Sequence, residues 1–167
     1  METSIAALVA ILDEEISVYQ ELLQLAEAKR KLIGIVDKLA EFEELTKREA
    51  QLAQAIIAAE DKRMQIMDEL ASQLGSHLAA ATLAEVAEAV DGPEREQLLA
   101  RRQTLSELLA ELKNETTLTR KLLDRELRFI NYSLSLVTGE GENKQGYSEL
   151  GSKQKSATGR SLLDWKA

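Results

Sequence analysis

Apolar residues recur every three or four positions through the first half of the chain, which is the spacing of one face of an α-helix. The stripe runs from Ile5 to Leu74, and no Pro interrupts it. It predicts a single continuous helix over residues 4–74, about 105 Å long. Gly34 lies within this stretch, and we expect it to bend the helix.

A short helix and a second long helix are predicted after this stretch. Thr82 and Glu85 have the spacing of a capping box, so a short helix is expected over residues 82–91. Pro93 suits the first turn of the next helix, because its missing amide would have no partner there. The apolar stripe that follows predicts a helix over residues 93–138, which nearby glycines end.

Both apolar stripes need cover from water, and the short connection lets the second long helix fold back antiparallel on the first. The predicted fold class is therefore all-α, an elongated antiparallel hairpin or bundle of two long helices with a short connecting helix. The first helix is the longer one by roughly 40 Å, which leaves the stripe from Ile5 to Leu25 without a partner. The short helix, the C-terminal segment, a second copy of the chain or another protein are the alternatives that would cover it.

The composition of the chain changes at residue 139. Five of the eight Gly lie in the last 29 residues, among Ser, Lys, Gln and Asn. Residues 1–138 carry 16 basic and 25 acidic side chains, whereas residues 139–167 carry 5 and 4. We therefore expect a helical hairpin domain over 1–138 and a flexible tail over 139–167. The tail contains a short amphipathic stretch, Ser161–Trp165, close to its end.

Few sequence features suggest catalysis. The chain has no Cys and a single His, His77, which argues against thiolate chemistry and His-rich metal sites. Since no phosphate-binding loop is present either, we expect no enzymatic activity, no metal and no cofactor. The net charge of −8 argues against binding of nucleic acid or anionic lipid through the overall field.

The N-terminal segment lacks the basic region of a secretion signal, and no apolar run approaches the about 20 residues that cross a bilayer. The sequence thus predicts a cytoplasmic protein with no stable membrane insertion. Protein partners remain as the broad class, and the helical periodicity fits two kinds of interaction. An amphipathic helix of a partner could complete the bundle, or the chain could form a homodimeric coiled-coil scaffold.

Several short segments follow one another in a characteristic order along the chain. They are Tyr19–Arg30, Glu60–Arg63, Leu70–Gly75, Thr82–Glu85, Leu108–Asn114, Leu122–Leu123, Leu127–Phe129 and Tyr147–Gly151. Their order and spacing resemble those of the FlgN family, the cytoplasmic chaperones of the flagellar type III export system. The resemblance covers nearly the whole chain and rests on order and spacing, because no single segment is distinctive.

The resemblance implies an export chaperone that binds the hook-associated proteins FlgK and FlgL and delivers them to the export gate. It also implies that the later part of the second long helix binds the terminal helical segments of these proteins. The matching residues are Leu122, Leu123, Leu127, Phe129, Ile130, Leu134 and Val137. A Tyr in the C-terminal region of the family is tied to contact with the gate protein FlhA, and Tyr147 is the matching residue here.

Overall fold

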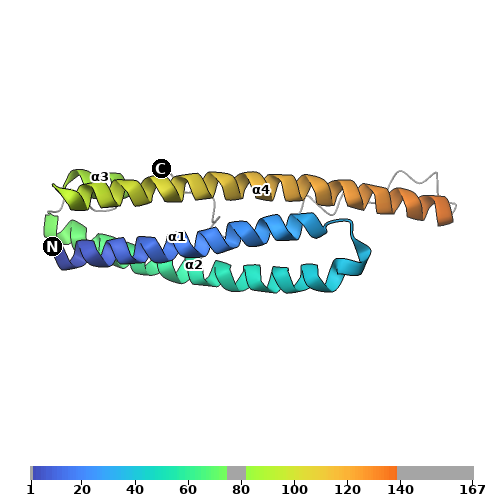
Figure 1. Cartoon of the computed structure of the whole chain (residues 1–167), viewed down its shortest axis with the longest axis horizontal. Coiled ribbons are helices and arrows are strands. Elements are labelled where there is room, and N and C mark those ends of the chain that lie inside the picture. The colour runs from blue at the N-terminus through green and yellow to red at the C-terminus, as the bar shows by residue number, and fades with distance from the viewer. Residues whose placement is uncertain (1, 75–81, 139–167) are drawn as a thin grey trace.

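The structure, a computed structural model, describes residues 2–74 and 82–138 of the chain. In this part of the chain the backbone forms helices and no strands, so the predicted all-α class and the elongated bundle are confirmed. Figure 1 shows the long helices lying side by side with their axes roughly aligned. They are α1 (Glu2–Leu32), the 3-10 helix η1 (Val36–Lys38), α2 (Leu39–Leu74), α3 (Leu83–Glu88) and α4 (Pro93–Thr138).

The helix predicted over 4–74 is in fact two helices, because the chain reverses at Gly34 instead of bending there. Gly34 has φ +83°, a left-handed conformation that glycine adopts at little cost. The amide of Ile35 donates a hydrogen bond to the Leu32 carbonyl over 3.2 Å, which closes the last turn of α1. Ile35 itself is extended, with φ −102° and ψ 100°, so the backbone leaves the helix direction.

Ion pairs fix α1 and α2 as antiparallel neighbours. Lys29 near the end of α1 pairs with Glu49 near the start of α2. Farther from the turn, Arg63 of α2 donates from Nε to Oε1 of Glu15 over 2.8 Å. The reversal lets the apolar stripe of α2 cover that of α1, which a continuous helix could not do.

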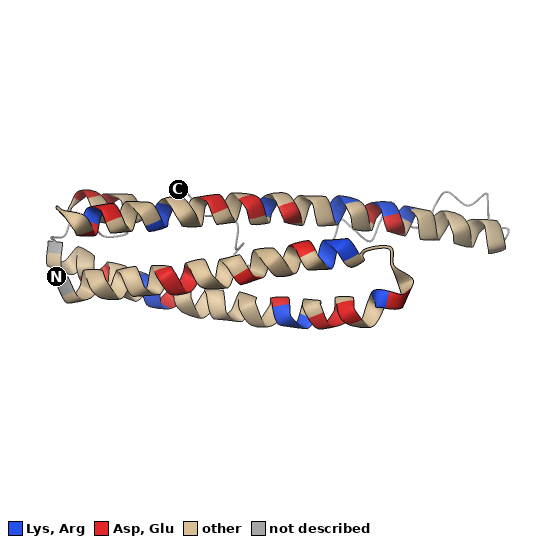
Figure 2. Ribbon diagram, viewed as in Figure 1, with Lys and Arg blue, Asp and Glu red and all other residues tan. Residues whose placement is uncertain are grey.

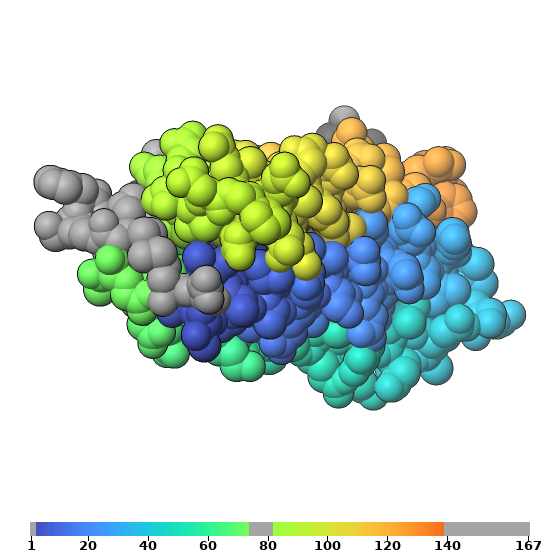
Figure 3. Space-filling model, turned by 60° about the vertical axis from the view of Figure 1, so that its left-hand side comes forward, coloured from blue at the N-terminus to red at the C-terminus, as the bar shows by residue number. Residues whose placement is uncertain are grey.

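The second long helix, α4, runs parallel to α1 and therefore antiparallel to α2. Arg101 near its start pairs with Asp13 at 2.9 Å, and Glu115 farther along pairs with Arg30 at 2.6 Å. α4 therefore packs mainly against α1, to which it is parallel, and the closely packed antiparallel pair is α1 with α2. In Figure 3 α1, in dark blue, lies between the yellow-green start of α4 and the green to cyan residues of α2.

The stripe from Ile5 to Leu25, predicted to lack a partner, is covered by the chain itself. Leu8 and Leu12 are fully buried, and Ile5 and Tyr19 are each 4% exposed. The prediction failed because α1 contacts both α2 and α4 along its length, whereas a continuous first helix would have faced α4 alone. The exposed apolar surface of the molecule is therefore not at the start of α1.

The short helix α3 begins with the predicted capping box. The Thr82 hydroxyl accepts a hydrogen bond from the Glu85 amide over 3.3 Å, and the Glu85 carboxylate accepts one from the Thr82 amide over 2.6 Å. The Thr82 hydroxyl also donates a hydrogen bond to the same carboxylate over 2.9 Å. The hydrogen bond from the Thr82 amide and, after it, the one from the Thr82 hydroxyl lower the pKa of Glu85. α3 ends at Glu88, earlier than the predicted residue 91, and packs its buried Leu83 and Val86 against α4 and α2.

Replacing Gly34 with Ala is expected to lower the free energy of unfolding by about 1–2 kcal/mol, because a side chain is strained at this φ. A Cβ there would also lie 3.3 Å from Cδ of Glu126. Gly92 is the matched control, since it has φ +79° but its Cβ would meet its nearest neighbour, a Glu94 oxygen, at 3.6 Å. Urea unfolding of both Ala variants should show the larger loss for Gly34, and an unchanged stability there would contradict this account of the turn.

Candidate functional site

Most exposed large apolar side chains of the described residues gather at one end of the molecule. Nine lie on the last six turns of α4 and three lie at the turn between α1 and α2. We call this set the distal surface. It consists of Leu118, Leu123, Leu127, Phe129, Ile130, Tyr132, Leu134, Leu136 and Val137 of α4 with Ile35, Val36 and Leu39 of the turn.

The distal surface is exposed because α4 outlasts the hairpin that supports it. Gly34 in the turn lies next to the Glu126 carboxyl, so α4 passes the end of the hairpin at this point. Residues 127–138 then continue for about 18 Å beyond it. Figure 1 shows this orange end of α4 projecting past the turn that joins α1 to α2. No described part of the chain is left to cover it.

The projecting segment is apolar on more than one face. Leu123, Leu127, Ile130, Leu134 and Val137 follow one another at steps of four and three, which is the repeat of a coiled-coil stripe. Phe129, Tyr132 and Leu136 lie on other sides of the helix and are 62–66% exposed. Figure 2 shows charged residues along all the long helices but none on the last turns of α4. Such a segment can be enclosed by apolar groups of a partner.

Six of the seven residues predicted for substrate binding belong to the distal surface, with exposures from 40% at Leu123 to 85% at Val137. The seventh, Leu122, is only partly exposed. The structure brings these residues onto one stretch of α4, although nothing in it shows what they bind. Tyr147 and the predicted tail lie outside the described residues.

Sequence reasoning missed the contribution of the turn. Ile35, Val36 and Leu39 are 50%, 88% and 62% exposed, whereas the helical stripe had assigned Val36 and Leu39 to a buried face. The available signal was Gly34 with apolar residues directly after it, since a reversal at Gly places such residues at an exposed turn. Tyr132 and Leu136 were also missed, because they lie off the main stripe.

Apart from the distal surface, a shallow hollow that is open to solvent lies between α1 and α2. Alanines at residues 7 and 10 widen the space there, and its rim carries charged groups of both signs. The lining residues are Ala7, Ala10, Ile11, Glu14, Lys62, Gln65, Ile66 and Glu69. The groups around it offer no recognisable chemistry, and the described residues contain no cluster of potential metal ligands.

A polar cluster is buried between α1 and α2. Glu15 is fully buried, and its Oε1 accepts a hydrogen bond from Arg63, while no group of residues 2–74 or 82–138 bonds its Oε2. One turn away, the Tyr19 hydroxyl donates to Glu60 over 3.2 Å. Burial raises the pKa of Glu15, although the Arg63 guanidinium opposes the shift, and burial with the Glu60 charge raises the pKa of Tyr19. The cluster is enclosed and contributes to the pairing of the helices.

No helix in the described part of the chain is long and apolar enough to cross a membrane. Comparison with protein families matches residues 1–155 to the family described as FlgN protein. No curated protein and no solved structure matches the chain.

Proposed function

The chain belongs to the FlgN family, whose members are flagellar export chaperones, and from this premise we propose that it holds FlgK and FlgL unassembled and delivers them to the export gate. Chaperones of this family bind hook-associated proteins in general. The chain is therefore a flagellar export chaperone, and the proposal adds which clients it takes and where they bind. The distal surface carries the proposal.

The support comes from the kind of surface that the distal end of α4 offers. An amphipathic helix of a client needs apolar side chains at helical spacing, and Leu127, Ile130 and Leu134 present them at half exposure or more. A set of exposed large apolar side chains gathered at one end is typical of a surface that binds a partner. In this proposal the predicted set from Leu122 to Val137 contacts a terminal helical segment of the client, together with the turn residues Ile35 and Val36.

Delivery needs a second contact, and the resemblance assigns it to Tyr147. We propose that this residue contacts FlhA at the gate and that the chaperone works in the cytoplasm. No step of this cycle requires chemistry, since capture and release are binding events, so no catalytic turnover is proposed.

Purified protein is expected to form a stable complex with FlgK, FlgL or both, with one chaperone for each client. Titration calorimetry gives the affinity, and light scattering of the isolated complex gives its mass. A client lacking its C-terminal helical segment is the control, and it should not bind. Absence of binding to either protein would contradict the proposal.

A self-associating scaffold is the alternative function, but the structure does not have the feature that favoured it. It rested on an uncovered stripe from Ile5 to Leu25, and these residues are buried within the bundle. The distal surface could also pair two copies of the chain, so the same light-scattering measurement distinguishes the two functions. A dimer that captures neither hook-associated protein would favour the scaffold.

A further inference from the structure

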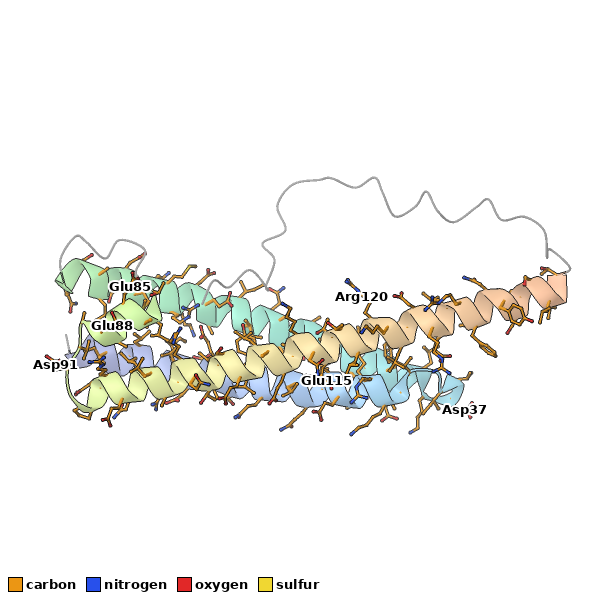
Figure 4. All side chains as sticks on the ribbon, turned by 90° about the horizontal axis from the view of Figure 1, so that it is seen from above. Asp37, Glu85, Glu88, Asp91, Glu115 and Arg120 are labelled. Carbon is orange, nitrogen blue, oxygen red and sulfur yellow. The ribbon has the colours of Figure 1, made fainter. Side chains whose placement is uncertain are left out.

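The distal part of α4 carries basic side chains that form no ion pair with any residue that the structure describes. Arg120, Lys121, Arg125 and Arg128 are all exposed, and none forms an ion pair with an acidic side chain of the described residues. Arg128 donates only to the backbone carbonyl of Asp124, over 3.2 Å. Figure 4 shows Arg120 pointing away from α1, whereas Glu115 one turn earlier reaches Arg30 of α1. Glu115 is thus the last charged side chain of α4 that pairs with the hairpin, and it precedes this group of cations.

The local charge is opposite to that of the whole chain. Residues 116–138 carry four basic and two acidic side chains, a net charge of +2, whereas the chain carries −8. One of the two acidic groups, Glu126, lies against Gly34 at the turn. This leaves Asp124 as the acidic residue among four cations, so the outward side of this segment is positive.

These cations border the apolar part of the distal surface. Neighbours on a helix surface are three or four residues apart. Arg125 therefore lies beside Phe129, and Arg128 lies beside Tyr132, and both aromatic residues are more than 60% exposed. A partner that covers the aromatic side chains brings its own border residues next to these two guanidinium groups.

We infer that the client segment captured here is an amphipathic helix whose apolar stripe is bordered by acidic residues. This inference rests on the proposed function and specifies the chemistry of the partner. Carboxylates of the partner would pair with Arg125 and Arg128, each of which can hold a carboxylate by two parallel hydrogen bonds. Charge pairs at the border of an interface fix its register and speed association, while the apolar stripe supplies most of the affinity.

A protein helix fits these observations better than an anionic membrane surface. A helix that lies on a membrane needs one apolar face with a cationic face opposite. Here the apolar residues occupy more than one side of α4, and Asp124 lies among the cations. The net charge of −8 would also repel an anionic bilayer from the rest of the molecule.

Two designed helical peptides with the same leucine stripe, one bordered by Glu and the other by Lys, test the inference. The intact chain is expected to bind the Glu-bordered peptide about tenfold more tightly at low salt, since two exposed charge pairs each contribute a few-fold. The variant Arg125→Glu with Arg128→Glu should reverse this preference. The matched control is Arg95→Glu with Arg102→Glu, which makes the same charge change near the start of α4 and should keep the preference.

Equal affinities for the two peptides, or a preference that the double variant leaves unchanged, would overturn the inference. If FlgK or FlgL is still captured in that case, the proposed function survives while the acidic border is wrong. Loss of all binding, of both peptides and both hook-associated proteins, would reject the proposed function as well. Stronger binding to phosphatidylserine vesicles than to the Glu-bordered peptide would overturn the inference in favour of a membrane surface.

Discussion

Replacing Leu127 and Ile130 together with Asp is expected to abolish capture of hook-associated proteins and to leave the helices intact. The two side chains are 57% and 50% exposed, so charges at these positions stay in water in the free protein. In the complex they would be buried against an apolar stripe without a partner, at a cost of several kcal/mol. That cost corresponds to a loss of affinity of about a hundredfold or more. Titration calorimetry measures the affinity, and circular dichroism measures the helix content.

The control is a double Asp variant at Ile57 and Met64 of α2. These residues are 41% and 47% exposed and lie outside the distal surface, so the variant makes the same chemical change on another helix. Its affinity should stay within about twofold of the original. Equal losses in the two double variants would show that clients do not bind at the distal surface.

Replacing Arg63 with Ala is expected to lower the free energy of unfolding by about 3–5 kcal/mol, since it leaves a buried acidic group without its partner. Glu15 is fully buried, and Arg63 supplies the hydrogen bond to its Oε1. The pKa of Glu15 is already raised by burial, and loss of the guanidinium would raise it further. Urea unfolding at neutral pH gives the change in stability.

The matched control for this prediction is Arg48→Ala. Arg48 also joins α2 to α1, through Glu21 at 2.6 Å, but the two side chains are 51% and 46% exposed. Water screens this pair, so its loss should cost no more than about 1 kcal/mol. If both variants lose the same stability, the buried pair does not hold α1 and α2 together more strongly than a surface pair.

Local signals in the sequence predicted several boundaries correctly. Thr82 and Glu85 form the capping box that their spacing indicated, and α4 begins at Pro93. Both features depend on residues within one helical turn, so no distant part of the chain changes them. The end of α3 was predicted three residues too late, at residue 91, whereas the helix ends at Glu88.

The reversal at Gly34 could not be predicted from the stripe. One Gly inside a helix costs only about 1 kcal/mol, and the steps of three and four resume in α2 immediately after the turn. The reversal depends on packing between residues that are far apart in the sequence. Leu12 and Tyr19 are buried only because α2 returns over them and α4 covers the other side of α1.

The predicted substrate-binding residues lie on the helix whose end carries the exposed apolar surface, although the length argument from sequence had placed that surface elsewhere. A comparison of the lengths of the helices predicted over 4–74 and 93–138 placed the uncovered apolar surface at the start of the first helix, because that helix was the longer one. With the reversal, α4 becomes the longest helix, and its own end is uncovered. The resemblance to the FlgN family indicated Leu127 and Ile130, whereas the contribution of Ile35 and Val36 required the turn to be known.

Hydrogen exchange of the free protein and of its complex with a hook-associated protein tests the central claim most directly. Amides of residues 118–138 should exchange faster in the free protein than those of residues 98–112, because the other described residues leave most of this stretch of α4 exposed. Binding should slow exchange over 118–138 and at the turn, and leave most of α1 and α2 unchanged. Protection that appears instead between α1 and α2, with 118–138 unaffected, would contradict the account.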